Sequence, residues 1–116
     1  EQMDFYFKAS SHWKILYPVA LNATNEKKAI EEKITKFINT ENAQRLNLAF
    51  NSYRNNEGFV IIQGITTAEY AASVVAVLKE NLSYKIEIPA VIISNENYKI
   101  VQIKKNLNSY LEAKKE

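Results

Sequence analysis

The stretch that decides the fold runs from residue 46 to residue 64 and reads Leu-Asn-Leu-Ala-Phe-Asn-Ser-Tyr-Arg-Asn-Asn-Glu-Gly-Phe-Val-Ile-Ile-Gln-Gly. From Leu46 to Asn51 apolar side chains alternate with more polar ones, which is the period of two of a half-buried strand. Residues 54–58 are types that tolerate a positive φ, and they separate this strand from the apolar run Phe59–Ile62. The stretch therefore predicts a β-hairpin whose second strand lies centrally in a sheet and is covered by helices on at least one side.

The residues before this hairpin predict a strand and an amphipathic helix. The segment His12–Tyr17 has strand character and ends at Pro18, which cannot donate to a ladder. Apolar residues then recur at helical spacing within a charged segment, which predicts a helix over about residues 26–41.

The residues after the hairpin predict a helix, a strand and a last helix. Thr66-Thr67-Ala68-Glu69 is a capping-box pattern and opens a helix over about residues 67–82. The following β-rich stretch is interrupted by Pro89, which implies an edge strand, a bulge, or a strand that starts at Ala90. Capping residues from Ser94 onward then introduce one C-terminal helix, whose shared apolar face consists of Ile100, Ile103, Leu107, Tyr110 and Leu111.

The predicted element order is strand, helix, strand, strand, helix, strand, followed by a helix. This order is the split βαββαβ pattern, so we expect a ferredoxin-like α+β fold: an antiparallel sheet with two helices on one face and an additional C-terminal helix. We expect a single domain over residues 10–116, preceded by residues 1–9 with Phe5-Tyr6-Phe7 as either an edge strand or a linker.

Composition bounds the functional classes. A chain of 116 residues with 47% apolar and 24% charged residues has the balance of one folded domain and not of a disordered segment. The net charge of +2 is too small for a strong field toward nucleic acid or anionic lipid. Cysteine is absent and aspartate occurs once, so we expect no metal and no cofactor.

Motifs for catalysis are missing from the sequence. His12 is the only histidine and has no neighbouring group that would complete a triad or an acid/base pair. With Gly58 and Gly64 as the only glycines, neither a phosphate-binding loop nor a dinucleotide fingerprint can be built. We therefore expect that the protein is not an enzyme.

One segment resembles a nucleic-acid motif in part. RNA-recognition motifs carry a glycine-aromatic pattern on the third strand, as in Gly58 to Gly64, but here Ile61 replaces an aromatic residue that would stack a base. A buried central strand is the favoured interpretation. Single-stranded nucleic acid binding and peptidoglycan binding remain as alternatives to the function expected below.

Two segments together resemble a known family. They are His12-Trp13-Lys14-Ile15-Leu16-Tyr17-Pro18 and Val91-Ile92-Ile93-Ser94-Asn95-Glu96-Asn97-Tyr98. They resemble the C-terminal domain of the large tetratricopeptide-repeat lipoproteins of the type IX secretion and gliding motility system of Bacteroidetes, the SprE and PorW group. The resemblance covers about residues 10–112, with Gly58 to Ile65, Ala68 to Leu78 and Tyr110-Leu111 in the corresponding places.

This resemblance implies a non-enzymatic scaffold that binds other proteins of the secretion machinery, such as ring or translocon subunits. It also implies a location on the periplasmic side of the bacterial outer membrane. The membrane tether would then lie in a preceding part of a longer lipoprotein, and this domain would have no membrane span and no nucleic-acid partner.

The expected partner surface follows from the strand alternation. If two helices cover the face with Leu46, Leu48 and Phe50, then the side chains of Asn47, Asn51 and Tyr53 project from the other face, with Lys14 beside them. Such a polar surface with one aromatic residue is typical of a non-obligate interface. The alternative is that the C-terminal helix folds back over this face and buries it.

Overall fold

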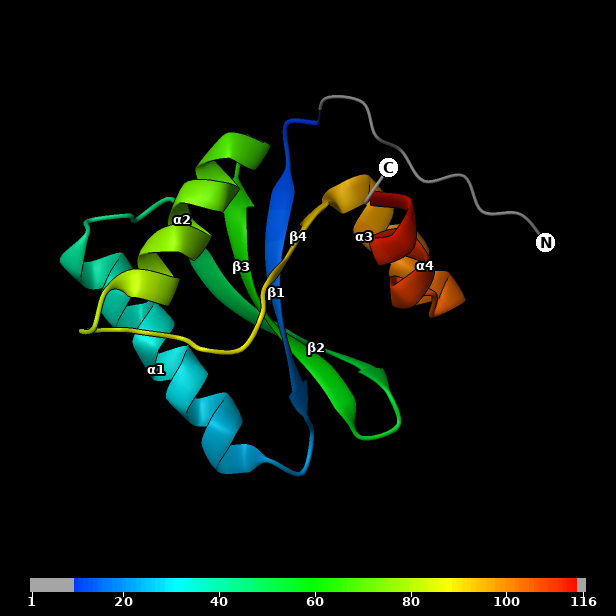
Figure 1. The fold of residues 1–116 in the computed structure, drawn as a ribbon, viewed down its shortest axis with the longest axis horizontal. Helices are drawn as coiled ribbons and strands as arrows, with labels where there is room; N and C mark the ends of the chain where they lie inside the picture. Colours follow the sequence, from blue (N-terminus) through cyan, green and yellow to red (C-terminus); the bar gives the residue numbers. More distant parts are fainter. Residues whose placement is uncertain (1–9, 115–116) are drawn as a thin grey trace.

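The computed structural model describes residues 10–114, so the expectation for Phe5-Tyr6-Phe7 and the rest of residues 1–9 lies outside the described chain. The elements follow the predicted order, with one more helix at the end (Figure 1). They are β1 (Trp13–Ala20), α1 (Thr24–Thr40), β2 (Asn47–Arg54), β3 (Glu57–Ile65), α2 (Ala68–Glu80), β4 (Val91–Ser94), α3 (Asn95–Lys104) and α4 (Leu107–Lys114).

The four strands form one antiparallel sheet in the order β2-β3-β1-β4. The predicted hairpin is confirmed, because β2 pairs with β3 from Asn47 opposite Gln63 to Arg54 opposite Glu57. Strand β3 is central as expected, and β2 and β4 are the two edge strands. The fold is therefore α+β, with an antiparallel sheet as its frame.

Helices α1 and α2 cover one face of the sheet, which we call the first face (Figure 1). Ile34 of α1 and Leu78 of α2 are fully buried there against Ile15, Tyr17 and Ile62 of the central strands. The bounds of α1 and α2 agree with the predicted helices to within two residues. This packing buries the apolar stripe that the sequence places on each helix.

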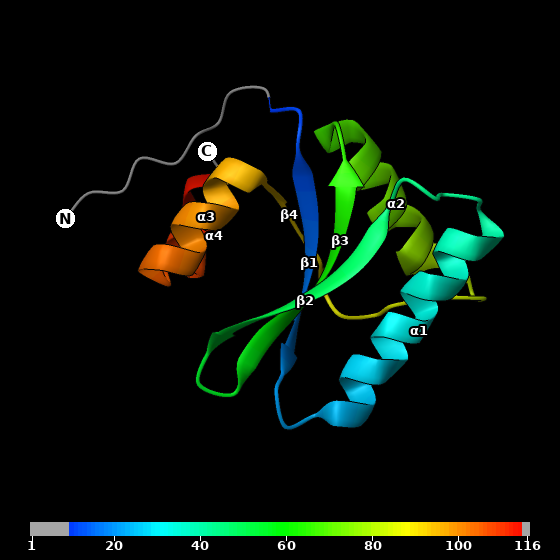
Figure 2. The same ribbon diagram turned by 180° about the vertical axis from the view of Figure 1, so that it is seen from behind.

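Helices α3 and α4 lie on the opposite side of the sheet, which we call the second face (Figure 2). Tyr98 and Val101 of α3 and Tyr110 of α4 pack on Leu16 and Phe59 of the central strands. The hydroxyl of Tyr110 donates to the backbone oxygen of Ile92, 3.1 Å away. The sheet thus lies between two layers of helices, and each layer has its own apolar core. We call the core under α1 and α2 the first core and the core under α3 and α4 the second core.

The first strand runs beyond the proline that was expected to end it. Strand β1 continues to Ala20 and pairs with β3 at Pro18, opposite Phe59. On its other side β1 pairs with β4 only from Trp13 to Leu16, so at Pro18 it has β3 as its single neighbour. A proline is tolerated there because its missing donor faces no strand.

The expectation of one C-terminal helix is wrong in one respect, because the chain breaks between α3 and α4. Lys105 ends α3 in the left-handed region with φ of 54°, and α4 begins at Leu107. A straight helix would hold Ile103 and Tyr110 on one face, but Ile103 is 70% exposed while Tyr110 is 2% exposed. The break lets Tyr110 reach the second core, which no sequence pattern indicates.

Two local expectations concern α2 and β4, and the first needs correction. The N-cap of α2 is Thr67 and not Thr66, since its side chain accepts a hydrogen bond from the backbone N–H of Tyr70 at 3.0 Å. Strand β4 is an edge strand, which is one of the alternatives expected for this stretch; it begins at Val91, and residues 81–90 form an irregular connection. In that connection Tyr84 is buried and its hydroxyl donates to the carboxylate of Glu41, which ties the connection to the end of α1.

Candidate functional site

A row of polar side chains crosses the second face at the end that α3 and α4 leave open. Asn47 of β2 lies opposite Gln63 of β3, and a register irregularity between β1 and β3 brings Lys14 within reach of the same glutamine. The Lys14 Nζ atom donates to Gln63 Oε1 at 3.0 Å, and Gln63 Nε2 donates to Asn47 Oδ1 at 2.8 Å. Three neighbouring strands are thus joined by side-chain hydrogen bonds.

Helix α3 extends this row with a tyrosine and a glutamine. The hydroxyl of Tyr98 donates to Asn51 Oδ1 at 2.8 Å. The Nε2 atom of Gln102, one turn along the helix, donates to the Tyr98 hydroxyl at 2.8 Å and to the backbone oxygen of Ser52 at 3.1 Å. We call the resulting surface the amide face, made of Lys14, Asn47, Asn51, Gln63, Tyr98 and Gln102.

Lys14 is the charged group of the amide face. Its side chain is half-buried and its Nζ atom lies over the Tyr98 ring, 5.7 Å from the ring centroid. It forms no ion pair with any residue between 10 and 114. Partial desolvation lowers the pKa of Lys14 from its usual range.

Three of the four residues expected to form a partner surface lie on the amide face. Asn47 and Asn51 are exposed, and Lys14 is half-buried. The alternation along β2 therefore predicts the correct face for these residues. Gln63, Tyr98 and Gln102 were missed, and of these only Gln63 had a signal in the sequence, because it continues the alternation of Phe59 and Ile61 on β3.

The expectation that Tyr53 is exposed is wrong. Tyr53 is 6% exposed, and its ring lies 4.9 Å from the Phe59 ring, measured between centroids. Its hydroxyl accepts a hydrogen bond of 3.0 Å from the backbone N–H of Leu107, the first residue of α4. Tyr53 lies under α4, so it serves the second core and cannot be a contact for a partner.

The segment that resembles an RNA-recognition motif is also covered. Phe59 is 2% exposed and Ile61 is fully buried, beneath α3 and α4. An RNA-recognition motif stacks bases on aromatic side chains that are open to solvent on this strand. The sheet therefore offers no such platform at Phe59.

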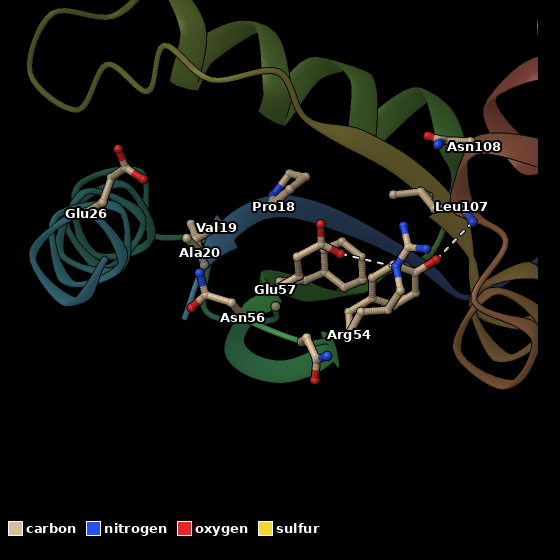
Figure 3. A pocket seen from close by; sticks show the side chains of 13 residues that line it. Pro18, Val19, Ala20, Glu26, Arg54, Asn56, Glu57, Leu107 and Asn108 are labelled. Atoms are coloured by element: carbon tan, nitrogen blue, oxygen red, sulfur yellow. Dashed lines mark hydrogen bonds and ion pairs between the residues drawn. The ribbon is translucent and has the colours of Figure 1, made fainter. Parts of the chain in front are cut away.

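A pocket of about 560 Å³ lies at the other end of the second face (Figure 3). It is bounded by the β2–β3 turn, by Pro18 of β1 and by Leu107 and Asn108 of α4, with Glu26 of α1 at its far end. Its ion pair, between Arg54 Nε and Glu57 Oε1 at 3.2 Å, is largely exposed to solvent. Such a pair lies in water and contributes little binding energy.

The region around His12 contains hydroxyl groups and one carboxylate. The Nδ1 atom of His12 lies 3.0 Å from the Ser11 hydroxyl, and the Ser10 hydroxyl donates to Glu96 Oε1 at 2.8 Å. Hydrogen bonds from the Glu96 backbone N–H and from Ser10 lower the pKa of Glu96. The Ser10 hydroxyl is joined to His12 only through the His12 backbone, whose N–H donates to it at 3.2 Å, so these groups do not make a relay from an acid through the imidazole to a nucleophile.

Within residues 10–114 no group of three or more His, Cys, Asp or Glu side chains is arranged to hold a metal ion. No helix in this part of the chain is both long and apolar enough to cross a membrane. The chain matches no family, no curated protein and no solved structure in comparisons of its sequence and fold.

Proposed function

We propose that this chain is a non-enzymatic protein interaction domain and that the amide face is its contact surface. The observation that carries the proposal is the side-chain network of the amide face, where β1, β2, β3 and α3 hold exposed amides and one cation in fixed positions. A preorganised polar surface of this kind suits a non-obligate interface, because little side-chain entropy is lost when a partner binds.

The resemblance to the SprE and PorW group supplies the biological setting of the proposal. In that setting the domain is a scaffold of a lipoprotein of the type IX secretion and gliding motility system, on the periplasmic side of the outer membrane. Its partners are other proteins of the machinery, such as ring or translocon subunits.

We also propose that the fold is a ferredoxin-like variant. The βαββαβ element order, the central β1 and β3 strands and the shared face of α1 and α2 support this assignment. The variant differs in its second helical layer, since α3 and α4 occupy the sheet face that a two-layer fold leaves open.

The geometry favours a protein partner over the two alternatives. Burial of Phe59 removes the stacking surface that single-stranded nucleic acid binding requires. Peptidoglycan binding would benefit from an aromatic ring that is free to stack on a sugar, but on the amide face Lys14 lies over the ring of Tyr98.

Affinity capture tests the proposal. The tagged chain is incubated with envelope extract of a gliding member of the Bacteroidetes, and the bound proteins are identified by mass spectrometry. Asn51→Arg places a bulky cation on the amide face, and Asn39→Arg makes the same change on an exposed position of α1, behind the first face.

We expect the unchanged chain and Asn39→Arg to recover components of the type IX machinery, and Asn51→Arg to recover at least tenfold less. Recovery of no component of the system by the unchanged chain would contradict the proposed setting. Equal recovery by both variants would contradict the amide face as the contact surface.

A further inference from the structure

Within residues 10–114, the positive charge of Lys14 on the amide face has no negative charge paired with it. Lys14 has three N–H donors, and the structure gives them one acceptor, the Oε1 atom of Gln63. The other members of the amide face are neutral side chains. A half-buried ammonium group in neutral surroundings has lost part of its hydration without gaining a counter-charge.

The orientation of the amides makes the surface a donor surface. Each of the four amide oxygens already accepts a hydrogen bond from within the protein. The donors are Gln63 Nε2 to Asn47, Tyr98 Oη to Asn51, Lys14 Nζ to Gln63, and Lys105 Nζ to Gln102, at 2.8 to 3.0 Å. The groups left for a ligand are therefore mainly N–H groups, above all the amide of Asn47 and the remaining donors of Lys14.

We infer that the amide face binds a carboxylate side chain of a partner protein, with Lys14 as the charged contact and the Asn47 amide as the neutral one. A carboxylate accepts up to four hydrogen bonds and supplies a negative counter-charge for the Lys14 ammonium group, so it complements both the donors and the charge of this surface. The inference rests on the proposed function, because it assigns the chemistry of the partner at the same surface.

The occupant is an acidic segment of a protein and not a cell-wall glycan. Sugar recognition relies on an exposed aromatic ring, and the one ring on the amide face belongs to Tyr98, which is 7% exposed and lies under the Lys14 ammonium group. An acidic side chain needs only the cation and the donors that are already in place.

Nuclear magnetic resonance of the ¹⁵N-labelled full chain tests this inference. The probe is the peptide acetyl-Thr-Glu-Thr-Glu-Thr-amide, and its control is the same peptide with glutamine in place of glutamate. We expect the acidic peptide to shift the amide signals of Lys14, Asn47 and Gln63 in a saturable manner. The glutamine peptide should leave these signals in place.

Three variants make the test specific. Lys14→Met keeps most of the apolar stem and removes the charge, while Gln63→Glu provides an internal carboxylate within 3.0 Å of the Lys14 Nζ atom. We expect each to weaken binding of the acidic peptide at least tenfold. Lys36→Met removes an exposed lysine from α1 and should leave binding unchanged.

Binding that survives in both Lys14→Met and Gln63→Glu would overturn the inference, and so would shifts spread evenly over the lysines of α1. Muramyl dipeptide serves as a cell-wall probe. Its binding to the amide face, in the absence of any effect of the acidic peptide, would also overturn the inference.

Failure here and failure of the proposed function can be distinguished. If envelope capture succeeds but the acidic peptide does not bind, the proposed function stands and the carboxylate chemistry is wrong. If the peptide binds but capture finds no component of the machinery, the site stands and the proposed setting is wrong.

Discussion

Tyr53 provides the sharpest test of how the second helical layer is held on the sheet. It is 6% exposed, packs against the tilted ring of Phe59 and accepts a hydrogen bond from the Leu107 N–H at the start of α4. Tyr53→Ala removes a buried ring and leaves a cavity, so it should lower the free energy of unfolding by about 3–5 kcal/mol. Tyr53→Phe removes only the hydroxyl and should cost about 1 kcal/mol.

Urea unfolding followed by circular dichroism measures both variants. For a domain of this size, about 1 kcal/mol corresponds to a shift of roughly 4 °C in Tm, so Tyr53→Ala should melt roughly 12–20 °C lower. Because Tyr53→Ala could leave no folded protein to measure, Tyr53→Phe is also studied by hydrogen exchange, which reports on the hydrogen bond to Leu107 alone. Its Leu107 amide should exchange with solvent deuterium about fivefold faster, as expected for a local loss of about 1 kcal/mol.

A loss below about 1 kcal/mol for Tyr53→Ala would contradict this prediction, since that is the range of surface positions. It would mean that α4 does not cover Tyr53. Unchanged exchange at Leu107 in Tyr53→Phe would separately refute the assigned hydrogen bond.

Three further predictions concern stability. Gly64→Ala should lower the free energy of unfolding, measured with urea, by at least about 1–3 kcal/mol of backbone strain. The reason is that φ is +92° at Gly64 and an added Cβ atom would lie 2.2 Å from the Arg45 backbone oxygen. Ser94→Ala should cost about 1 kcal/mol in the same assay through loss of the α3 N-cap. Burial raises the pKa of Tyr17 to about 12 from 10.0, so the folded chain keeps a proton that the unfolded chain loses. This contribution, up to about 2–3 kcal/mol, is complete below pH 10 and is lost as the pH rises toward 12. Because burial also raises the pKa of Tyr110 to about 12, Tyr17→Phe should make the fall in stability over this pH range smaller without abolishing it.

Each of these has an outcome that would count against it. A Gly64→Ala protein as stable as the parent would show that the backbone near the end of β3 can relax at this position. A Ser94→Ala protein with an unchanged midpoint would mean that the cap is not needed. If the parent chain and Tyr17→Phe lose the same free energy of unfolding between pH 10 and pH 12, the loss comes from groups other than the Tyr17 hydroxyl.

The hairpin and the first core could be predicted from the sequence because they depend on local patterns. The alternation around Leu48 and Phe50 specifies which side of β2 faces α1, and the helical spacing of Ile30 and Ile34 specifies the buried side of α1. Binary patterns of this kind act within one element and its nearest neighbour, so they can be read without knowing the rest of the fold.

The second face could not be predicted to the same extent, because its outcome depends on contacts between distant segments. The apolar stripe from Ile100 to Tyr110 is compatible with one continuous helix. The chain instead breaks at Lys105, where a non-glycine residue adopts a positive φ. Contacts made by Tyr53 and Tyr110 accompany that break, and neither contact can be seen in the local sequence.

The candidate site was half predictable for the same reason. The alternation along β2 predicts the positions of Asn47 and Asn51, and the first strand was expected to place Lys14 on the same face. Tyr98 and Gln102 join them only because α3 turns back beside β2, as the hydrogen bonds to Asn51 and Ser52 show. The hydrogen-bond direction of each amide, which makes the surface donor-rich, emerges only in three dimensions.

The most direct test of the central claim is site-specific photo-crosslinking in living cells of a gliding member of the Bacteroidetes. A benzophenone amino acid replaces Asn51 on the amide face in one strain and Asn39 on α1 in another, both of which are exposed positions. We expect position 51 to form a crosslink to a protein of the secretion machinery and position 39 to form none. Crosslinks from position 39 alone, or from neither position with the chain present at its normal level, would contradict this expectation.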